Sequence, residues 1–311
     1  MTSTPRDPES EVRDAVDRSQ SGAPADGKVI RDRFSADEIF QRVIVSADEE
    51  IDATTRELFF SGLAAGFAIT LAFLLHAVVT AAVPGPMGPT VGAVLYPIGF
   101  VYIIIGRYQL YTENTLPPVA LVLTRLTSVP ALLRIWVVVL CANAVGAALG
   151  ALVLSQTGVF SPPAAAVAVG FGTEALETSW WDLFAKALFA GWLVAGLVWL
   201  EHASRDTISR IVLVYVIFLC IPVGGLYHSV VSICDAFYLA FETGTGILPV
   251  LWEFVTPVVL GNTVGGVFLV TLVNYMQTRD RYPEPLAERP TLSLRQWLVG
   301  WGRSPRVDRS D

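Results

Sequence analysis

The most constraining feature of the sequence is an almost uncharged stretch of 220 residues. Residues 58 to 277 carry 9 acidic and 6 basic side chains, whereas the whole chain of 311 residues carries 28 and 21. A helix needs about 20 apolar residues to cross the hydrocarbon of a bilayer, and several runs of that length occur here. The sequence therefore predicts an all-α polytopic membrane domain over residues 57–277.

The apolar runs give the number of crossings. They lie at about 58–83, 89–107, 116–124, 130–155, 182–200, 207–224, 228–241 and 254–276. Residues 116–124 and 228–241 are too short to cross alone, and each closely follows a longer run that polar or helix-breaking residues interrupt. We therefore predict six transmembrane helices, of which the second and the fifth are broken.

The charges of the connections predict the orientation. Residues 125–134 and 201–210 contain arginines, as do both tails, while residues 84–88, 156–181 and 242–253 contain no Lys or Arg. Basic residues concentrate on the cytoplasmic side of membrane proteins. We therefore expect a multi-pass protein of the cell membrane with both termini in the cytoplasm.

The flanking segments differ from the membrane domain. Residues 1–34 are polar without an apolar period, and we expect a disordered cytoplasmic tail. Within residues 35–56, a serine precedes a glutamate by three positions at Ser35 and again at Ser46, which is typical of helix starts and predicts two short amphipathic cytoplasmic helices. Residues 278–311 form a second cytoplasmic tail, in which 292–301 predict a short helix on the inner membrane surface.

The sequence also contains an internal repeat. The pairs are Ala65-Gly66-Phe67 with Ala190-Gly191-Trp192, Pro97-Ile98-Gly99 with Pro222-Val223-Gly224, Leu110-Tyr111-Thr112 with Leu226-Tyr227-His228, and Asn143-Ala-Val-Gly146 with Asn262-Thr-Val-Gly265. Three crossings per half give the halves opposite directions, so an inverted 3+3 repeat is predicted. Proteins of this architecture bind or pass solutes where broken helices meet near the midplane.

Several functions are excluded by what the sequence lacks. The net charge is −7 and lies mostly in the N-terminal tail, which argues against nucleic acid as a partner. The three cysteines lie in apolar runs without a CxxC pair. No nucleophile and base pair, metal cluster or cofactor motif occurs, so we expect neither an enzyme nor a cofactor.

The motifs at the breaks resemble those of the formate/nitrite transporter family over residues 35–278. The matching residues are Leu110-Tyr111-Thr112, His228-Ser229, and Gly261-Asn262 followed by Gly265-Gly266. Glu113 and Asn114 extend the first motif to the Leu-Tyr-Thr-Glu-Asn form of a less studied branch. The resemblance implies an aquaporin-like protomer, a homopentamer in the lipid bilayer, and passage of small monovalent anions such as formate, nitrite or hydrosulfide, in some cases with a proton.

The resemblance also implies which residues line the pore. His228 would protonate or stabilise the anion, because histidine holds or releases a proton near neutrality. Thr112 would hydrogen-bond the anion or the ring, and Asn262 either lines the pore or ties helices together. The family's constrictions fall on these residues: Tyr96 and Ile221 on the outer side, and Phe100, Leu110 and Tyr111 on the inner side.

Three charged residues are possible accessories. Asp235, two helical turns after His228, is either a proton relay or a neutral acid between protomers. Lys186 either replaces a lysine that relatives carry at the outer mouth or reaches to the interface. Arg107 is expected in a cytoplasmic vestibule, where it would attract anions. The pore asparagine of some relatives falls at Gly191, which places the identity of the substrate in question.

A neutral-solute pore of the aquaporin type is the alternative function. Aquaporins share the repeat, but their paired Asn-Pro-Ala is absent here and Thr112 and His228 hold the equivalent positions. Flux of weak acids would favour an anion pore, and flux of glycerol alone would favour the alternative.

Overall fold

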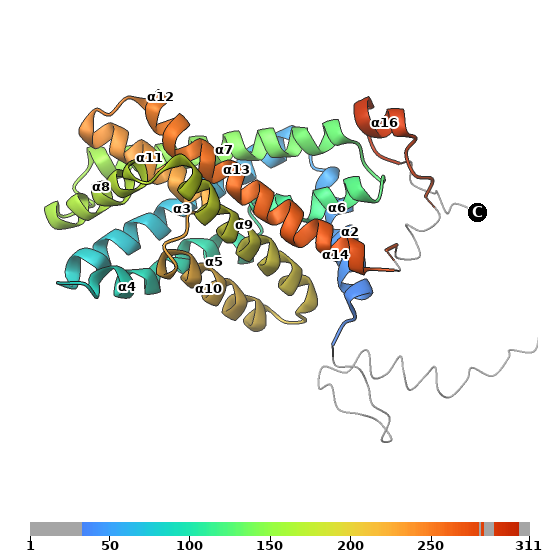
Figure 1. Ribbon diagram of the computed structural model, residues 1–311, viewed down its shortest axis with the longest axis horizontal. Coiled ribbons are helices and arrows are strands. Elements are labelled where there is room, and N and C mark those ends of the chain that lie inside the picture. The colour runs from blue at the N-terminus through green and yellow to red at the C-terminus, as the bar shows by residue number, and fades with distance from the viewer. Residues whose placement is uncertain (1–32, 280, 283–288, 305–311) are drawn as a thin grey trace, which may run out of the picture.

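The regular structure of the chain is helical throughout the part that can be described. A computed structural model describes residues 33–279, 281–282 and 289–304, and the regular elements in these residues are all helices (Figure 1). The predicted all-α fold class is therefore confirmed. The tail predicted to be disordered, residues 1–34, lies outside the described residues except for its last two positions.

Within the described residues, five helical stretches are long and apolar enough to cross a bilayer. Their elements are α3 (Thr55–Ala82); α4 (Gly88–Gly92), η1 (Ala93–Leu95) and α5 (Pro97–Ile105); α7 (Val129–Gln156); α9 (Trp180–Ala203); and α12 (Ile247–Val250), η3 (Leu251–Val255), α13 (Thr256–Val264), η4 (Gly265–Leu272) and α14 (Val273–Gln277). A further apolar helix, α10 (Thr207–Val223), is shorter. The chain thus has the helices of a multi-pass membrane protein.

Two short helices follow α5 and α10 where the sequence predicts short apolar segments. They are α6 (Pro117–Leu123) and α11 (Ser229–Thr243). Pro117 and Pro118 begin α6, since proline suits the first helical turn, where its missing N–H has no partner to lose. Gly244, with φ of 71°, ends α11 in the left-handed conformation that glycine adopts without strain.

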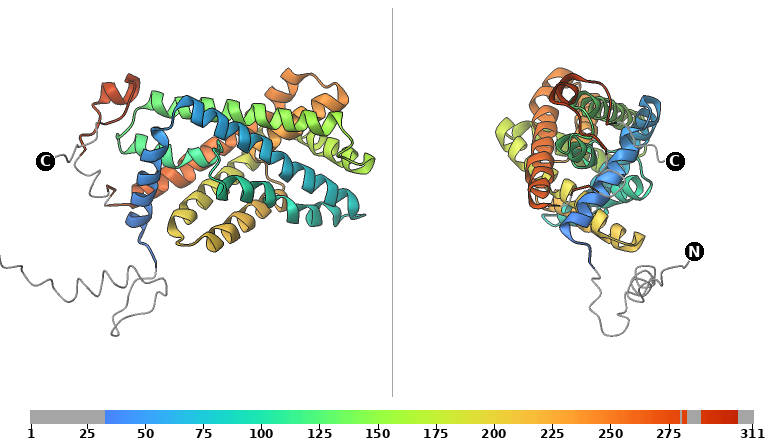
Figure 2. Two further views of the ribbon diagram at one scale, coloured as in Figure 1. Left: turned by 180° about the vertical axis from the view of Figure 1, so that it is seen from behind. Right: turned by 90° about the vertical axis from the view of Figure 1, so that its right-hand side faces the viewer.

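The helices lie roughly along one long axis, and the two described ends of the chain share one end of the molecule. Helix α2 (Ala36–Ile51), α6, α14 and α16 (Leu294–Val299) lie there, while α4, α12 and α8 (Pro162–Glu177) lie at the other end (Figure 1). The view from behind likewise shows α2 and α16 at one end of the molecule (Figure 2).

The segment before the membrane forms one helix rather than the two that the sequence predicts. The side chain of Ser35 accepts a hydrogen bond from the backbone of Glu38 and begins α2, which continues without a break past Ser46 to Ile51. One side of α2 is buried along its whole length, so packing overrides the second start signal. The next start is at Thr54, which forms the same reciprocal hydrogen bonds with Glu57 and begins α3.

Helix α8 was not predicted, since residues 156–181 were expected to form a connection. Its sequence is rich in Ala and Gly and has no polar face. Buried small residues such as Ala164 and Ala168 let α8 pack on α3 and α11. Its stability therefore comes from tertiary packing, which local sequence does not report.

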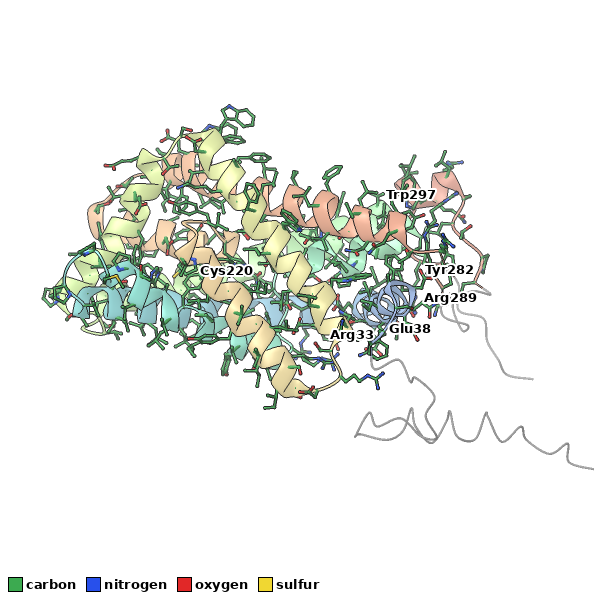
Figure 3. The ribbon with its side chains drawn as sticks, turned by 60° about the horizontal axis from the view of Figure 1, so that its bottom comes forward. Arg33, Glu38, Cys220, Tyr282, Arg289 and Trp297 are labelled. Atoms are coloured by element: carbon green, nitrogen blue, oxygen red, sulfur yellow. The ribbon has the colours of Figure 1, made fainter. Side chains whose placement is uncertain are left out.

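The C-terminal strap, residues 289–304, is anchored on the α6–α7 connection. The N–H groups of Leu292 and Ser304 donate to the carbonyls of Arg125 and Leu126, both at 2.9 Å. The indole N–H of Trp297 donates to the Val122 carbonyl at 2.8 Å. Figure 3 shows Tyr282, Arg289 and Trp297 gathered at the end of the molecule where α2 lies. Helix α16 lies within residues 292–301, where the sequence predicts a short helix on the membrane surface. Its Trp297 side chain hydrogen-bonds to the protein itself, at Val122.

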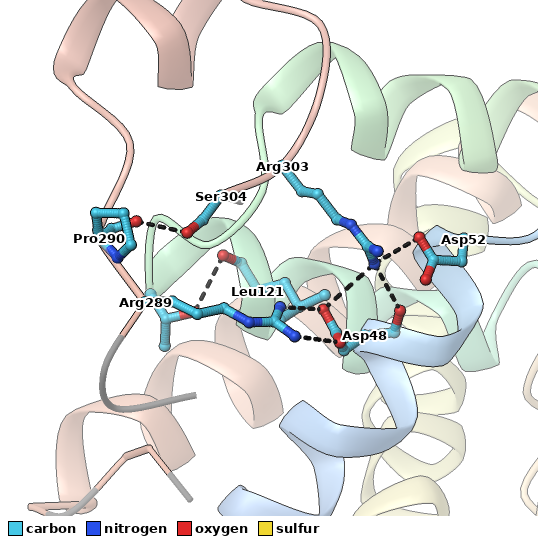
Figure 4. A network of polar contacts seen from close by, with 8 residues as sticks. Asp48, Asp52, Leu121, Arg289, Pro290, Arg303 and Ser304 are labelled. Atoms are coloured by element: carbon cyan, nitrogen blue, oxygen red, sulfur yellow. Dashed lines mark hydrogen bonds and ion pairs between the residues drawn. The ribbon is translucent and has the colours of Figure 1, made fainter. Parts of the chain in front are cut away.

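The same strap is paired to α2 by two arginines (Figure 4). The guanidinium of Arg289 binds both carboxylate oxygens of Asp48, at 2.7 and 3.0 Å. Arg303 pairs with Asp52 at 2.5 Å and reaches Asp48 at 3.6 Å. Bidentate pairs of this kind are the strong ones, and the pair of Arg289 with Asp48 is largely buried. The strap therefore holds α2 against the body of the protein.

We predict that Arg289→Ala loosens the strap. Losing a largely buried charge-assisted pair costs about 1–3 kcal/mol, so exchange of the Leu292 and Ser304 amide hydrogens should become roughly ten- to a hundredfold faster. Hydrogen–deuterium exchange of the detergent-solubilised protein measures this. Arg295→Ala is the control, because Arg295 is exposed on α16. Equal exchange in both variants would contradict the role given to the pair.

Candidate functional site

The chain breaks after α5 and after α10, and both helices end in the same backbone pattern, which also ends α6. After α5, the N–H of Tyr108 donates to Ile103 and the N–H of Arg107 to Ile104. After α10, the N–H of Leu226 donates to Ile221 and the N–H of Gly225 to Pro222. Arg107 and Gly225 both turn left-handed, with φ of 58° and 60°. Arginine carries strain there that glycine avoids.

Each break is held by one buried asparagine. The side-chain N–H groups of Asn143 donate to the carbonyls of Gly62 and Gln109, and its oxygen accepts from the N–H of Tyr111. In the other half of the chain, Asn262 donates to Ala187 and Tyr227 and accepts from the N–H of Ser229. Both amides are fully buried.

Asn262 is expected from the sequence either to line the pore or to tie helices together. Its oxygen and both N–H groups are committed to the backbone, at 2.7 to 2.9 Å. It therefore holds the loop before α11 in place, as Asn143 holds the loop before α6. The amide of Asn262 is a positioning group in this arrangement.

The register of the two breaks differs from the alignment of tripeptides in the sequence. The two clamps pair Tyr111 with Ser229 and Gln109 with Tyr227, whereas the sequence comparison pairs Tyr111 with Tyr227. The turns likewise match Arg107 with Gly225. Side-chain similarity guided the sequence comparison, while backbone hydrogen bonds fix the structural register.

Gly191, where some relatives carry a pore asparagine, is a packing residue here. A Cβ atom added at Gly191 would lie 2.1 Å from the carbonyl oxygen of Asn262, and one at Gly66 would lie 2.1 Å from that of Asn143. These two glycines therefore let α9 approach α13 and α3 approach α7 at the asparagine clamps. A larger side chain at Gly191 is excluded by the backbone behind it.

His228 and Thr112 meet between the two breaks. Thr112 Oγ1 lies 2.9 Å from His228 Nε2, and both residues are about 1% exposed. The hydroxyl donates to Nε2 when that nitrogen carries no hydrogen and accepts from it otherwise. The other ring nitrogen, Nδ1, is buried and forms no hydrogen bond with any described residue. A buried polar atom without a partner is costly, and such atoms mark sites of function.

Two stacked phenylalanines cover the His228 ring. The rings of Phe100 and Phe218 are stacked with centroids 3.5 Å apart, and the His228 ring meets the Phe100 ring edge-on at 4.9 Å. Tyr96 adjoins Phe100 at 5.4 Å. Phe218 was missed by sequence reasoning, although it lies one helical turn before Ile221 on the same face of α10.

The remaining predicted constriction residues are buried, but they do not all adjoin His228. Leu110 and Ile221 are at most 1% exposed. Tyr111 lies elsewhere, since its hydroxyl is 2.7 Å from Thr263 Oγ1 and its ring packs edge-on against Trp136. The side chain of Tyr111 thus contacts α7 and α13 rather than the aromatic rings around His228.

Asp235 and Lys186 lie toward the end of the molecule that holds α8. Asp235 is 8% exposed, and its Oδ1 has no hydrogen-bond partner among the described residues. Lys186 Nζ lies 5.7 Å from the centre of the Tyr227 ring, within the range of a cation–π interaction. Neither residue contacts the His228 ring.

A cavity of about 650 Å³ opens at the end of the molecule that holds α2. Arg107 and Leu110 line it. Sequence reasoning missed its other charged residues, because they come from separate elements. They are Arg42, Glu49 and Glu50 of α2, Glu113 of η2 (Glu113–Thr115), Glu201 of α9 and Arg210 of α10.

A family model for the formate/nitrite transporter matches residues 37–276, which is most of the chain. The chain belongs to the formate/nitrite transporter family. The resemblance inferred from the motifs is therefore confirmed, and so is the expectation of a transport protein rather than an enzyme.

Curated relatives in this family match at moderate identity. Inner membrane protein YfdC of Escherichia coli (strain K12) is 28% identical over 245 residues, which is 78% of each chain. The formate channel FocA of Haemophilus influenzae is 26% identical and covers 68% of this chain and 83% of its own length.

Two solved structures share the fold. One is an FNT family ion channel, with a TM-score of 0.65 and 21% identity over 78% of this chain and 97% of its own. The other is a pentameric formate channel with formate bound, with a TM-score of 0.60 and 19% identity over 71% and 96%. The helices of this chain are therefore arranged as in family channels.

We predict that Gly191→Ala disrupts the packing of α9 on α13. The added methyl group would overlap the Asn262 backbone, so either α9 shifts or the clamp on Ser229 is lost, at a cost of about 2 kcal/mol or more. Gly196→Ala is the control on the same helix, because no atom lies within 4 Å of the added Cβ. Thermal unfolding in detergent should show a lower midpoint for Gly191→Ala alone. Equal midpoints would contradict the close approach.

Proposed function

We propose that this protein is a channel for small weak-acid monovalent anions, such as formate or nitrite, in which His228 protonates or stabilises the passing anion. The observation that carries the proposal is the contact between Thr112 and His228. It joins the two breaks at 2.9 Å in a buried place and leaves His228 Nδ1 without a partner in the described structure.

The chemistry of the site suits a weak acid. A charge in hydrocarbon costs several kcal/mol, so a buried apolar passage rejects an anion that stays charged. Histidine near neutrality can supply a proton or, as imidazolium, a compensating charge. Nδ1 is the atom of His228 that we assign to the substrate, since Nε2 is already paired with Thr112.

The constrictions follow the same reasoning. Phe100 and Phe218 form the apolar barrier nearest His228, and Tyr96, Ile221 and Leu110 extend it. A hydrated ion is wider than a gap between stacked rings, whereas a neutral acid of three heavy atoms needs only a small opening. We propose Phe218 as a pore residue in addition to those expected from the sequence. Tyr111 is proposed to support the loop from behind.

The architecture we propose has six crossings, an inverted 3+3 repeat and an aquaporin-like protomer. The second crossing would consist of α4 to α5 followed by α6, and the fifth of α10 followed by α11. The matching asparagine clamps at the two breaks support this repeat. Residues 57–277 would then form the channel domain, with residues 35–56 and 278–311 on the cytoplasmic side.

The oligomeric state, the coupling to protons and the membrane environment are also proposals. A solved structure with this fold is a pentameric channel, and we propose a homopentamer in the lipid bilayer of the cell membrane. Exposed apolar side chains such as Phe67 and Trp192 on the outer helix faces suit contact with lipid or a neighbouring protomer. We propose protons as the partner of the anion, with Asp235 as the outer relay.

We assign roles in attracting anions to two further charged residues from their positions in the structure. Arg107 lines the cavity at the cytoplasmic mouth and would draw anions toward Leu110 and Thr112. Lys186 would play the same part at the outer mouth, near Tyr227. The alternative of a neutral-solute pore remains an outcome of the experiment below.

We predict that proteoliposomes carrying this protein pass formate, nitrite, hydrosulfide or acetate between pH 5 and 8. The fluxes of chloride and of glycerol should stay at the level of empty liposomes. His228→Ala should lower weak-acid flux by about tenfold or more and flatten its pH dependence, because the proton exchange at the ring is lost. Stopped-flow light scattering or a pH-sensitive dye measures the flux.

The matched control is His202→Ala. His202 is half-buried near the end of α9, and its Nδ1 lies 2.7 Å from the Val198 carbonyl oxygen, as expected of a structural histidine. Flux of glycerol alone would favour the neutral-solute pore. Weak-acid flux that is the same with and without His228 would contradict the role given to this residue.

A further inference from the structure

The cytoplasmic cavity has an unusual balance of charges for a passage that leads anions to the pore. Three arginines and four glutamates line it: Arg42, Arg107 and Arg210, and Glu49, Glu50, Glu113 and Glu201. When all seven are ionised, the lining carries one negative charge in excess. An anion on its way to Thr112 is then repelled by the cavity as a whole.

Glu113 lies at the inner limit of this cavity. It follows Thr112 directly in the chain, and Thr112 contacts His228. Its side chain is half-buried, lines the cavity, and interacts electrostatically with Glu201 of α9 and Glu50 of α2. An anion that enters from the cavity therefore passes this carboxyl group immediately before it reaches the proposed site.

The surroundings of Glu113 favour its neutral form when the cytoplasm is acidic. Carboxyl groups that share a poorly hydrated space resist ionising together. In α2, outside the membrane-spanning helices, burial raises the pKa of Glu50 to about 7, although Arg107 opposes the shift. One side-chain oxygen of Glu50, Oε2, is buried without a hydrogen-bond partner in the described structure.

Protonation of the glutamates reverses the sign of the net charge of the cavity lining. If Glu50, Glu113 and Glu201 each gain a proton, the three arginines outnumber the remaining Glu49 carboxylate. The other titratable groups around Glu113 are Tyr108 of its own loop and His202 of α9. Helices α6 and η4, which also pack against η2, present no titratable side chain to it.

We propose that Glu113 is a selectivity-determining residue at the inner mouth: its neutral form admits anions when the cytoplasm is acidic, and its carboxylate repels them when the cytoplasm is alkaline. This inference rests on the proposed function, because it assumes that anions pass here. It adds a role for a residue that the motif of this branch contains and that the proposed mechanism does not use. Arg107 is the attracting charge and Glu113 the opposing one.

The test is the ratio of formate flux in Glu113→Gln to that in the unchanged protein, in proteoliposomes with the same pH on both sides. The substitution removes a charge and keeps the shape. Because the fraction of formate that is protonated is the same for both proteins, the ratio isolates the effect of the cavity. We expect a gain of about three- to tenfold at pH 8 that falls to about one at pH 5.5.

Glu253→Gln is the control, since Glu253 is exposed on η3 and outside the cavity, and its ratio should stay near one at every pH. Glu201→Gln is the second variant, expected to change flux in the same direction, in case Glu113→Gln folds poorly. A ratio for both cavity variants that does not depend on pH would overturn this inference alone. Absence of formate flux in the unchanged protein would overturn the proposed function and, with it, this inference.

Discussion

The structure depends on satisfying backbone groups where two helices are interrupted inside an apolar protein. Water cannot supply hydrogen bonds to free N–H and C=O groups in hydrocarbon, so each interruption needs an internal partner. Asn143 and Asn262 provide it, each with one accepting oxygen and two donating hydrogens. Glycines at positions 66 and 191 bring the helices close enough for these amides to reach.

This constraint produces the site. Because the two clamps hold the loops before α6 and α11 rigidly, Thr112 of one loop and His228 of the other come within hydrogen-bond distance. The helices ahead of the breaks bring Phe100 and Phe218 together above the His228 ring. The proposed function uses this arrangement, because a buried apolar barrier admits a neutral weak acid at much lower cost than a permanent ion. Helix α2 lines the cavity that Arg107 and Leu110 also line.

Sequence predicted the features that depend on apolar length and on motifs. The long helices and the short segments α6 and α11 follow from local runs and spacing. The motifs also named Thr112 and His228, which the structure brings within 2.9 Å of each other. Phe218, Glu50 and Glu201 were missed because they reach the site from elements far apart in the chain. The register of the breaks was also misjudged, since backbone hydrogen bonds and not similar side chains pair Tyr111 with Ser229.

The helices outside the motifs show the same limit. Helix α8 has no polar face to mark it, and it forms because small residues pack on α3 and α11. In α2 the opposite happened, since Ser46 carries a start signal that a continuous buried face overrides. In both places tertiary packing decides what local patterns cannot. Arg289 of the strap and Asp48 of α2 are 241 positions apart in the sequence, so no local pattern predicts their pairing.

The central claim is that the two breaks act as one unit through Thr112 and His228. A double-mutant cycle of formate flux at pH 6 with Thr112→Val, His228→Ala and both together tests it most directly. If the two residues act together, the double variant loses no more flux than His228→Ala alone. Losses that multiply independently would contradict the account, because the two loops would then contribute separately.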